Sequence, residues 1–109
     1  MLLAFHSASL RKVCENEQHA KEELGEAVGK ALRHRLADMI AATSVSDLVA
    51  GRPREHAGNP SGQMAVDLCD NYCIVFKANH TKNPVTETGS TDWKRVSRIK
   101  ILRIGREHG

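Results

Sequence analysis

Two short stretches of the chain concentrate the side chains that could do acid–base or anion-binding chemistry. A glycine- and proline-rich loop, Gly51 to Gly62, carries Arg52, Arg54, Glu55 and His56, and the tail carries Arg106, Glu107 and His108. Histidine titrates nearest to neutral pH, so His56 and His108 are the candidate general acid and base, with Glu107 as an alternative base. A planar guanidinium can hold two phosphate oxygens at once, which makes Arg54 and Arg106 candidate anion clamps.

Each of these candidates also has a purely structural interpretation. His56 and Arg54 could be ordinary residues of a surface loop. His108 is next to the last residue of the sequence, where side chains are often poorly held. Glu107 could simply neutralise Arg106. The residue types therefore name candidates for a site without deciding between these interpretations.

A zinc site is the other chemistry that the sequence suggests. Cys69 and Cys73 lie close together, and His80 follows them. Structural zinc sites generally need two close pairs of ligands, and the sequence offers no second pair, so we expect no metal and no other cofactor. With Cys14 the chain has three cysteines, and an odd number in one small domain favours reduced thiols in the cytoplasm over a disulfide framework.

Basic charge is concentrated in the second half of the chain. Residues 1–50 hold six Lys and Arg against seven Asp and Glu, whereas residues 51–109 hold ten against six. From Lys94 to Arg106 there are six cations and no anion. This asymmetry favours a polyanionic partner such as RNA, with a solvated charged face as the alternative. The apolar start of the chain, before His6, is too short for a signal peptide or a membrane span.

The first half of the chain has a helical pattern after a short opening strand. Leu2 to Phe5 is an apolar run that predicts the strand. Ser7 or Ser9 is expected to cap a first helix that ends near Glu15. A second, long helix is predicted from Glu17 to Ala42, and Gly25 and Gly29 within it indicate close packing against another element. A further helical turn is expected between Thr43 and Ala50.

The second half of the chain predicts a hairpin and a final strand. Met64, Val66 and Leu68 share one face of the first hairpin strand with Tyr72, Ile74 and Phe76 of the second, if Cys69 to Asn71 forms the connection. The opposite face then carries Ala65, Asp67, Cys73, Val75 and Lys77, and we expect it to be open and functional. After a loop from Asn79 to Thr91, apolar residues of both parities predict a central strand from Val96 to Ile104.

This order of elements predicts one α+β domain that spans residues 1–109. Two helices are expected to pack on one side of a small, mainly antiparallel sheet, giving two layers. On the other side, Lys77, Lys100 and Arg103 could follow the backbone of a nucleic acid, together with Arg52 from the loop. Tyr72 and Trp93 are the only tyrosine and the only tryptophan, so few rings can stack on bases and binding should be mainly electrostatic.

In the order and spacing of its motifs, most of the chain resembles the RelE superfamily of toxins. It is most similar to the HigB branch, also called plasmid-maintenance killer proteins. The resemblance runs through residues 31–39, Ala41-Ala42-Thr43-Ser44, Gly51-Arg52-Pro53 with Gly58, Gly62-Gln63, Val66-Asp67-Leu68, Tyr72 to Phe76, Asp92-Trp93, residues 101–104 and His108.

The resemblance implies a RelE-like fold and a ribosome-dependent mRNA endonuclease. In such cleavage the 2′-hydroxyl of the RNA attacks the adjacent phosphate, so the protein supplies a base, an acid and cations without a metal. His108, Glu107, His56, Arg106 and Arg54 would fill these roles. The resemblance also implies a type II toxin–antitoxin system. The partner antitoxin would be a helix-turn-helix protein, and DNA would be bound only through their complex.

Three positions depart from the pattern of the HigB branch. Arg54 stands where a histidine typically follows Gly-Arg-Pro, Cys73 stands where an arginine typically follows the tyrosine, and Glu107 stands where a tyrosine typically precedes the last histidine. These differences leave two further functions open. The chain could be a catalytically weakened toxin-fold protein that mainly binds an antitoxin, or a structural or RNA-binding domain without an antitoxin.

Overall fold

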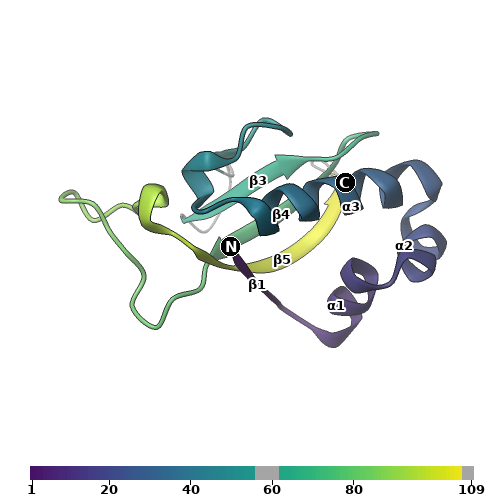
Figure 1. The fold of residues 1–109 in the computed structure, drawn as a ribbon, viewed down its shortest axis with the longest axis horizontal. Helices are drawn as coiled ribbons and strands as arrows, with labels where there is room; N and C mark the ends of the chain where they lie inside the picture. The colour runs from purple at the N-terminus through teal and green to yellow at the C-terminus, as the bar shows by residue number, and fades with distance from the viewer. Residues whose placement is uncertain (56–61, 107–109) are drawn as a thin grey trace.

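The computed structural model describes residues 1–55 and 62–106 and has a layer of helices on one side of a five-stranded sheet (Figure 1). The strand order is β1-β5-β4-β3-β2. The β1–β5 pair is parallel and the other pairs are antiparallel. The α+β class and the mainly antiparallel sheet are therefore confirmed. The two predicted helices are three α-helices in the structure.

The first two elements follow the sequence prediction. Strand β1 spans Leu2–Phe5, and helix α1 spans Ala8–Glu15. The Ser7 hydroxyl accepts a hydrogen bond from the Leu10 N–H at 3.1 Å, which satisfies one of the N–H groups left without a partner at a helix start. Because β1 pairs in parallel with the last strand, the two ends of the described chain lie in neighbouring strands.

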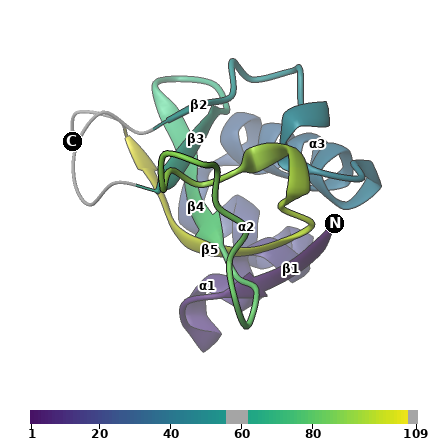
Figure 2. The same ribbon diagram turned by 90° about the vertical axis from the view of Figure 1, so that its left-hand side faces the viewer.

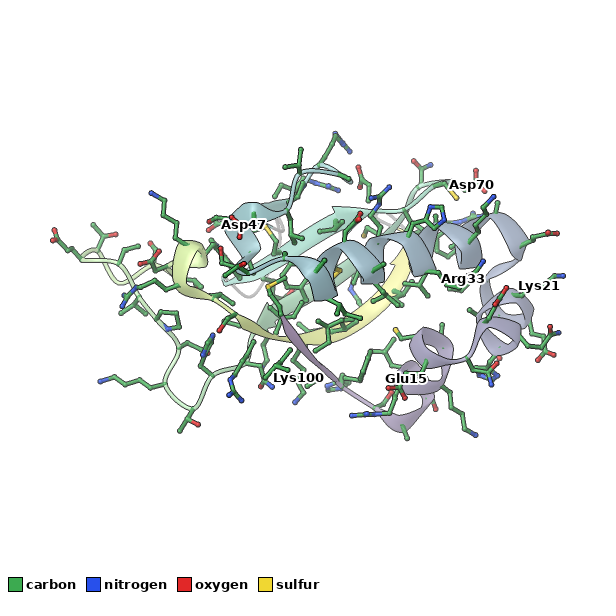
Figure 3. The ribbon with its side chains drawn as sticks, in the orientation of Figure 1. Glu15, Lys21, Arg33, Asp47, Asp70 and Lys100 are labelled. Atoms are coloured by element: carbon green, nitrogen blue, oxygen red, sulfur yellow. The ribbon has the colours of Figure 1, made fainter. Side chains whose placement is uncertain are left out.

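The predicted helix from Glu17 to Ala42 is wrong, because the chain turns at Gly25. Helix α2 spans Glu17–Leu24 and helix α3 spans Glu26–Ala41, and they pack on each other. Gly25 has φ 87°, a conformation that glycine adopts without steric cost. Gly29 is the point of close approach, since a Cβ there would lie 3.4 Å from the Lys21 backbone nitrogen. Arg33, labelled in Figure 3, joins the helices through Glu17 at 3.1 Å.

The predicted hairpin is confirmed. Strand β3 spans Gln63–Asp67 and strand β4 spans Tyr72–Ala78. Asp70 and Asn71 at its tip have φ 54° and 65°, the left-handed conformation that these two residue types tolerate. The cross-strand pairs Met64–Phe76 and Val66–Ile74 lie in the main core with residues of the helices, as the alternation predicts.

Strand β5, Arg98–Arg106, lies between β1 and β4, so its interior position is confirmed. Its pairing shifts by one residue: Phe76 faces Ile101, whereas Val75 faces Arg103. This bulge explains why apolar residues of both parities occur in the strand. Ile99, Ile101 and Ile104 pack in the main core, and Leu102 packs in a second cluster on the other side of the sheet. From Leu102 to Arg106 the residues of the strand are half-buried or exposed, so this end is not buried on both faces.

Short elements complete the structure. The 3₁₀-helix η1, Val45–Asp47, lies within the predicted helical turn, and Ser44 and Asp47 form its capping box. Strand β2, Arg54–Glu55, adds the far edge of the sheet, and 3₁₀-helix η2 spans Trp93–Arg95. Among the described residues, none of the helices combines the length and apolar character needed to cross a membrane.

Candidate nucleic-acid interface

The side of the sheet turned away from the helices is the candidate interface, and we call it the outer face. Figure 2 shows α3 packed against one side of the strands only. Strand register and alternation assign the side chains of the outer face. They are Leu2, Ala4, Arg54, Gln63, Ala65, Asp67, Cys73, Val75, Lys77, Arg98, Lys100, Leu102, Arg103 and Gly105.

The centre of the outer face is apolar and buried, so the expectation of an open face is wrong there. Ala65, Cys73 and Val75 are buried and form a separate cluster with the half-buried Leu102. The exposed fraction of Cys73 is 0%. These residues occupy interior strands, where small apolar side chains pack on their cross-strand neighbours. An added charge at this centre would therefore have no contact with water.

Basic side chains surround this apolar centre. Arg54, Ala65, Val75 and Arg103 form one row across four neighbouring strands. With strands about 4.8 Å apart, the two arginines stand roughly 14 Å from each other at the level of the backbone. The predicted RNA-binding residues Arg103 and Lys77 are exposed, and Lys100 is half-buried.

Lys77 and Lys100 are direct cross-strand partners. Like charges at directly opposite positions destabilise a sheet. A bound anion between the two lysines would relieve this repulsion. Arg98 lies on the same face two residues before Lys100 and is exposed. Sequence reasoning missed Arg98, although its spacing from Lys100 could have identified it. Among the described residues of the outer face, Asp67 is the single acidic one.

Asp67 is held between two arginines at the β2–β3 edge. Its Oδ2 accepts a hydrogen bond from Arg52 Nε at 2.7 Å, and its Oδ1 lies 3.0 Å from Arg54 Nη2. Partial burial pushes the pKa of Asp67 upward, but the hydrogen bonds and charges of the two arginines outweigh it and hold the pKa below its ordinary value. The carboxylate therefore stays ionised near neutral pH, and part of the positive charge at this edge is neutralised.

The predicted clamp Arg106 does not join this group. It pairs with Tyr72 across the strands and belongs to the other parity of β5. Its guanidinium carbon lies 5.4 Å from the centre of the Tyr72 ring, a cation–π contact that fixes it at the end of the sheet. His56, Glu107 and His108 lie outside the described residues, so the acid–base pair stays a prediction from the sequence.

The imidazole considered for zinc, that of His80, is engaged by the backbone. His80 Nε2 accepts hydrogen bonds from the backbone N–H groups of Ser97 and Arg98 at 3.1 and 3.3 Å. In the part of the chain that the structure describes, no group of three or more His, Cys, Asp or Glu side chains could hold a metal ion. Burial, with a smaller effect from Glu15, raises the pKa of the Cys14 thiol to about 12.

Glu55, the acidic residue of the Gly51 loop, has a structural partner that sequence reasoning missed. Its carboxylate accepts a hydrogen bond from Trp93 Nε1 at 3.1 Å. The Trp93 ring meets Phe76 edge to face, with centroids 6.4 Å apart. This contact ties β2 to η2 on the side of the sheet that carries the helices. No local pattern links these residues, because they are 38 positions apart.

Comparison with known proteins adds no family to this geometry. No protein-family model matches the sequence, and no curated protein matches it significantly.

Proposed function

We propose that the outer face binds single-stranded RNA and that the protein is a ribosome-dependent mRNA endonuclease. The observation that carries this proposal is the charge of the outer face, where the described charged residues are five cations, Arg54, Lys77, Arg98, Lys100 and Arg103, and one acid, Asp67. A row of cations along strands suits the regularly spaced phosphates of a nucleic acid. The resemblance of the sequence to HigB-like toxins supplies the reaction.

In the proposed reaction the RNA provides its own nucleophile. The 2′-hydroxyl loses a proton and attacks the adjacent phosphorus, and the 5′-oxygen of the next nucleotide leaves with a proton. His108 and His56 are proposed as base and acid, with Glu107 as an alternative base. Arg106, at the end of the sheet, is proposed to stabilise the charge of the pentacoordinate phosphorus, while the outer-face cations hold the RNA backbone. Arg54 is less suited to this task than the sequence suggests, since Asp67 already engages it.

The biological setting follows from the same resemblance. We propose a type II toxin–antitoxin system of the cytoplasm, in which a helix-turn-helix antitoxin binds this chain and neutralises it. DNA would then be bound only by the complex of the two proteins. The two-layer α+β structure is compatible with the RelE-like fold that this proposal requires.

A second function is favoured by the arginine–aspartate contacts. Both arginines of the Gly51 loop are bonded to Asp67, and the place of an expected third arginine is taken by the buried, uncharged Cys73. A toxin fold with fewer available cations would cleave slowly. Such a protein would act mainly as the partner of an antitoxin in a DNA-binding complex that represses its own operon.

Controlled expression followed by mapping of transcript ends tests the proposal. Wild-type protein should arrest growth and cut messages only while they are translated. The variant Lys77→Ala/Lys100→Ala should lose most of this effect, whereas Lys12→Ala/Lys30→Ala removes the same charge from exposed positions of α1 and α3 and should retain it. Intact transcripts in cells that contain folded wild-type protein would favour the second function.

A further inference from the structure

The two arginines that contact Asp67 are held in different ways. Arg54 is 27% exposed and uses both terminal nitrogens within the protein: Nη2 faces Asp67, and Nη1 donates to the Arg52 carbonyl at 3.0 Å. Arg52 is 74% exposed and meets Asp67 through Nε. The edge of its guanidinium formed by Nη1 and Nη2 is a second pair of donors, suited to two phosphate oxygens.

The backbone under Arg52 is also fixed. Gly51 and Arg52 have φ 85° and 48°, and the left-handed region is uncommon for a residue with a side chain. The Asp67 N–H donates to the Gly51 carbonyl at 2.6 Å. A Cβ on Gly51 would lie 2.6 Å from Val66 Cγ1, so only glycine fits there. Asp67 therefore contacts this loop through both its backbone and its side chain.

A depression opens beside this group at the end of the sheet. It is lined by Arg52, Asp67 and the hairpin tip from Leu68 to Tyr72, which includes Asp70. Figure 3 shows Asp70 exposed at that tip. A phosphate in the depression would meet the exposed edge of Arg52 and would be repelled by Asp70.

We propose that Asp67 is a positioning residue that holds Arg52 as a phosphate-binding residue, with Arg54 as the brace between them. This inference rests on the proposed binding of RNA and deepens it. An aspartate that merely blocked Arg52 would occupy its terminal nitrogens, whereas Asp67 meets Arg52 through Nε and leaves that side chain largely exposed. Fixing the guanidinium before binding lowers the ordering cost of contact with RNA.

Two substitutions that change the charge equally separate positioning from simple electrostatics. Asp67→Asn and Asp70→Asn each raise the net charge by one, and electrostatics alone makes both variants bind RNA more tightly. We expect Asp70→Asn to bind as tightly as wild type or more tightly. Asp67→Asn should bind roughly tenfold more weakly, because the support of Arg52 is lost. Fluorescence anisotropy with a labelled single-stranded RNA oligonucleotide measures both.

Arg52 provides a second test that does not depend on the folding of the Asp67 variant. Arg52→Gln should weaken binding roughly tenfold and reduce the slope of log K against log salt by about 0.7, the value for one phosphate contact to a single strand. Its melting temperature should fall only slightly, because Arg52 is 74% exposed and solvent screens its contact with Asp67. Adding Asp67→Asn to Arg52→Gln should cause no further loss of affinity, since Asp67 acts through Arg52.

Three results would overturn the inference. One is that Asp67→Asn binds as tightly as Asp70→Asn. Another is an unchanged affinity and salt slope for Arg52→Gln, and the third is a wild-type protein that does not bind the oligonucleotide. Transcript mapping distinguishes failure of the positioning role of Asp67 from failure of the proposed nuclease function. Cleavage that is unaffected by Asp67→Asn would reject the positioning role alone, and the expected binding pattern without cleavage would reject the nuclease alone.

Discussion

Cys73 occupies a position where burial decides what a substitution does. Its exposed fraction is 0%, and it faces Asp67 and Gly105 in the neighbouring strands. The pattern of the HigB branch typically has an arginine at this position. An arginine buried here would be a charge removed from water, so it would not provide an accessible phosphate clamp.

Cys73→Arg should therefore lower the free energy of unfolding by several kcal/mol, roughly 3 or more, and should reduce RNA binding through loss of structure. Cys69→Arg is the matched control, since Cys69 is only half-buried in the hairpin connection. That variant should change the free energy of unfolding by less than about 1 kcal/mol. Urea denaturation measures both. Equal stability of the two arginine variants would show that the centre of the outer face is open.

The stability contribution of Asp67 has a defined pH dependence. Its pKa is lower in the folded protein than in the unfolded chain. The stabilisation is therefore fully present above the pKa of Asp67 in the unfolded chain, which is about 4. It is lost as the pH falls through the lower pKa of Asp67 in the folded protein. Comparison of melting curves at neutral pH and near pH 3 should show wild type losing its advantage over Asp67→Asn in acid. A constant difference between the two proteins across that range would exclude this linkage.

At the scale of elements, the connection between η1 and β2 depends on Gly51. Ala at this position meets two penalties, the left-handed φ of 85° and a contact of 2.6 Å with Val66 Cγ1. Gly89 has nearly the same φ, 86°, but no atom lies within 4 Å of a Cβ built there.

Gly51→Ala should therefore cost more stability than Gly89→Ala. The difference should be roughly 1–3 kcal/mol, as for overpacking of a core, while Gly89→Ala carries the backbone cost alone. Urea titration of both variants gives the two values. Similar values would indicate that Val66 moves aside without cost.

The elements also show how far a sequence can predict this fold. Alternation in Met64 to Phe76 predicted the hairpin and its core side, because one face had to be apolar. The apolar stripe from Leu24 to Met39 continues through Gly25, so periodicity alone could not reveal that the helix breaks there. Periodicity could not reveal the bulge in β5 either. The apolar residues of both parities that it produces also fit a strand buried on both faces.

For the whole molecule, the charge asymmetry between the two halves of the sequence becomes an asymmetry between two sides of a sheet. Lys77, Lys100 and Arg103 were predicted from their types, and the strand register brings them to one face. The contacts of Asp67 with Arg52 and Arg54 could not be predicted, because 15 and 13 positions separate the partners and no local pattern links them. The proposed acid and base, His56 and His108, lie outside the described residues.

The salt dependence of RNA binding tests the central claim, that the outer face is the RNA-binding surface. Titration of a labelled single-stranded RNA oligonucleotide at several salt concentrations gives the slope of log K against log salt. Replacing Lys77 and Lys100 by alanine should weaken binding and reduce the slope by about 1.4, or about 0.7 for each lost phosphate contact.

The variant Lys12→Ala/Lys30→Ala loses the same net charge from the helices. It should keep the wild-type slope, because counterions are released only where phosphates are contacted. Equal reductions in the two double variants would contradict the account, since binding would then follow net charge rather than the outer face.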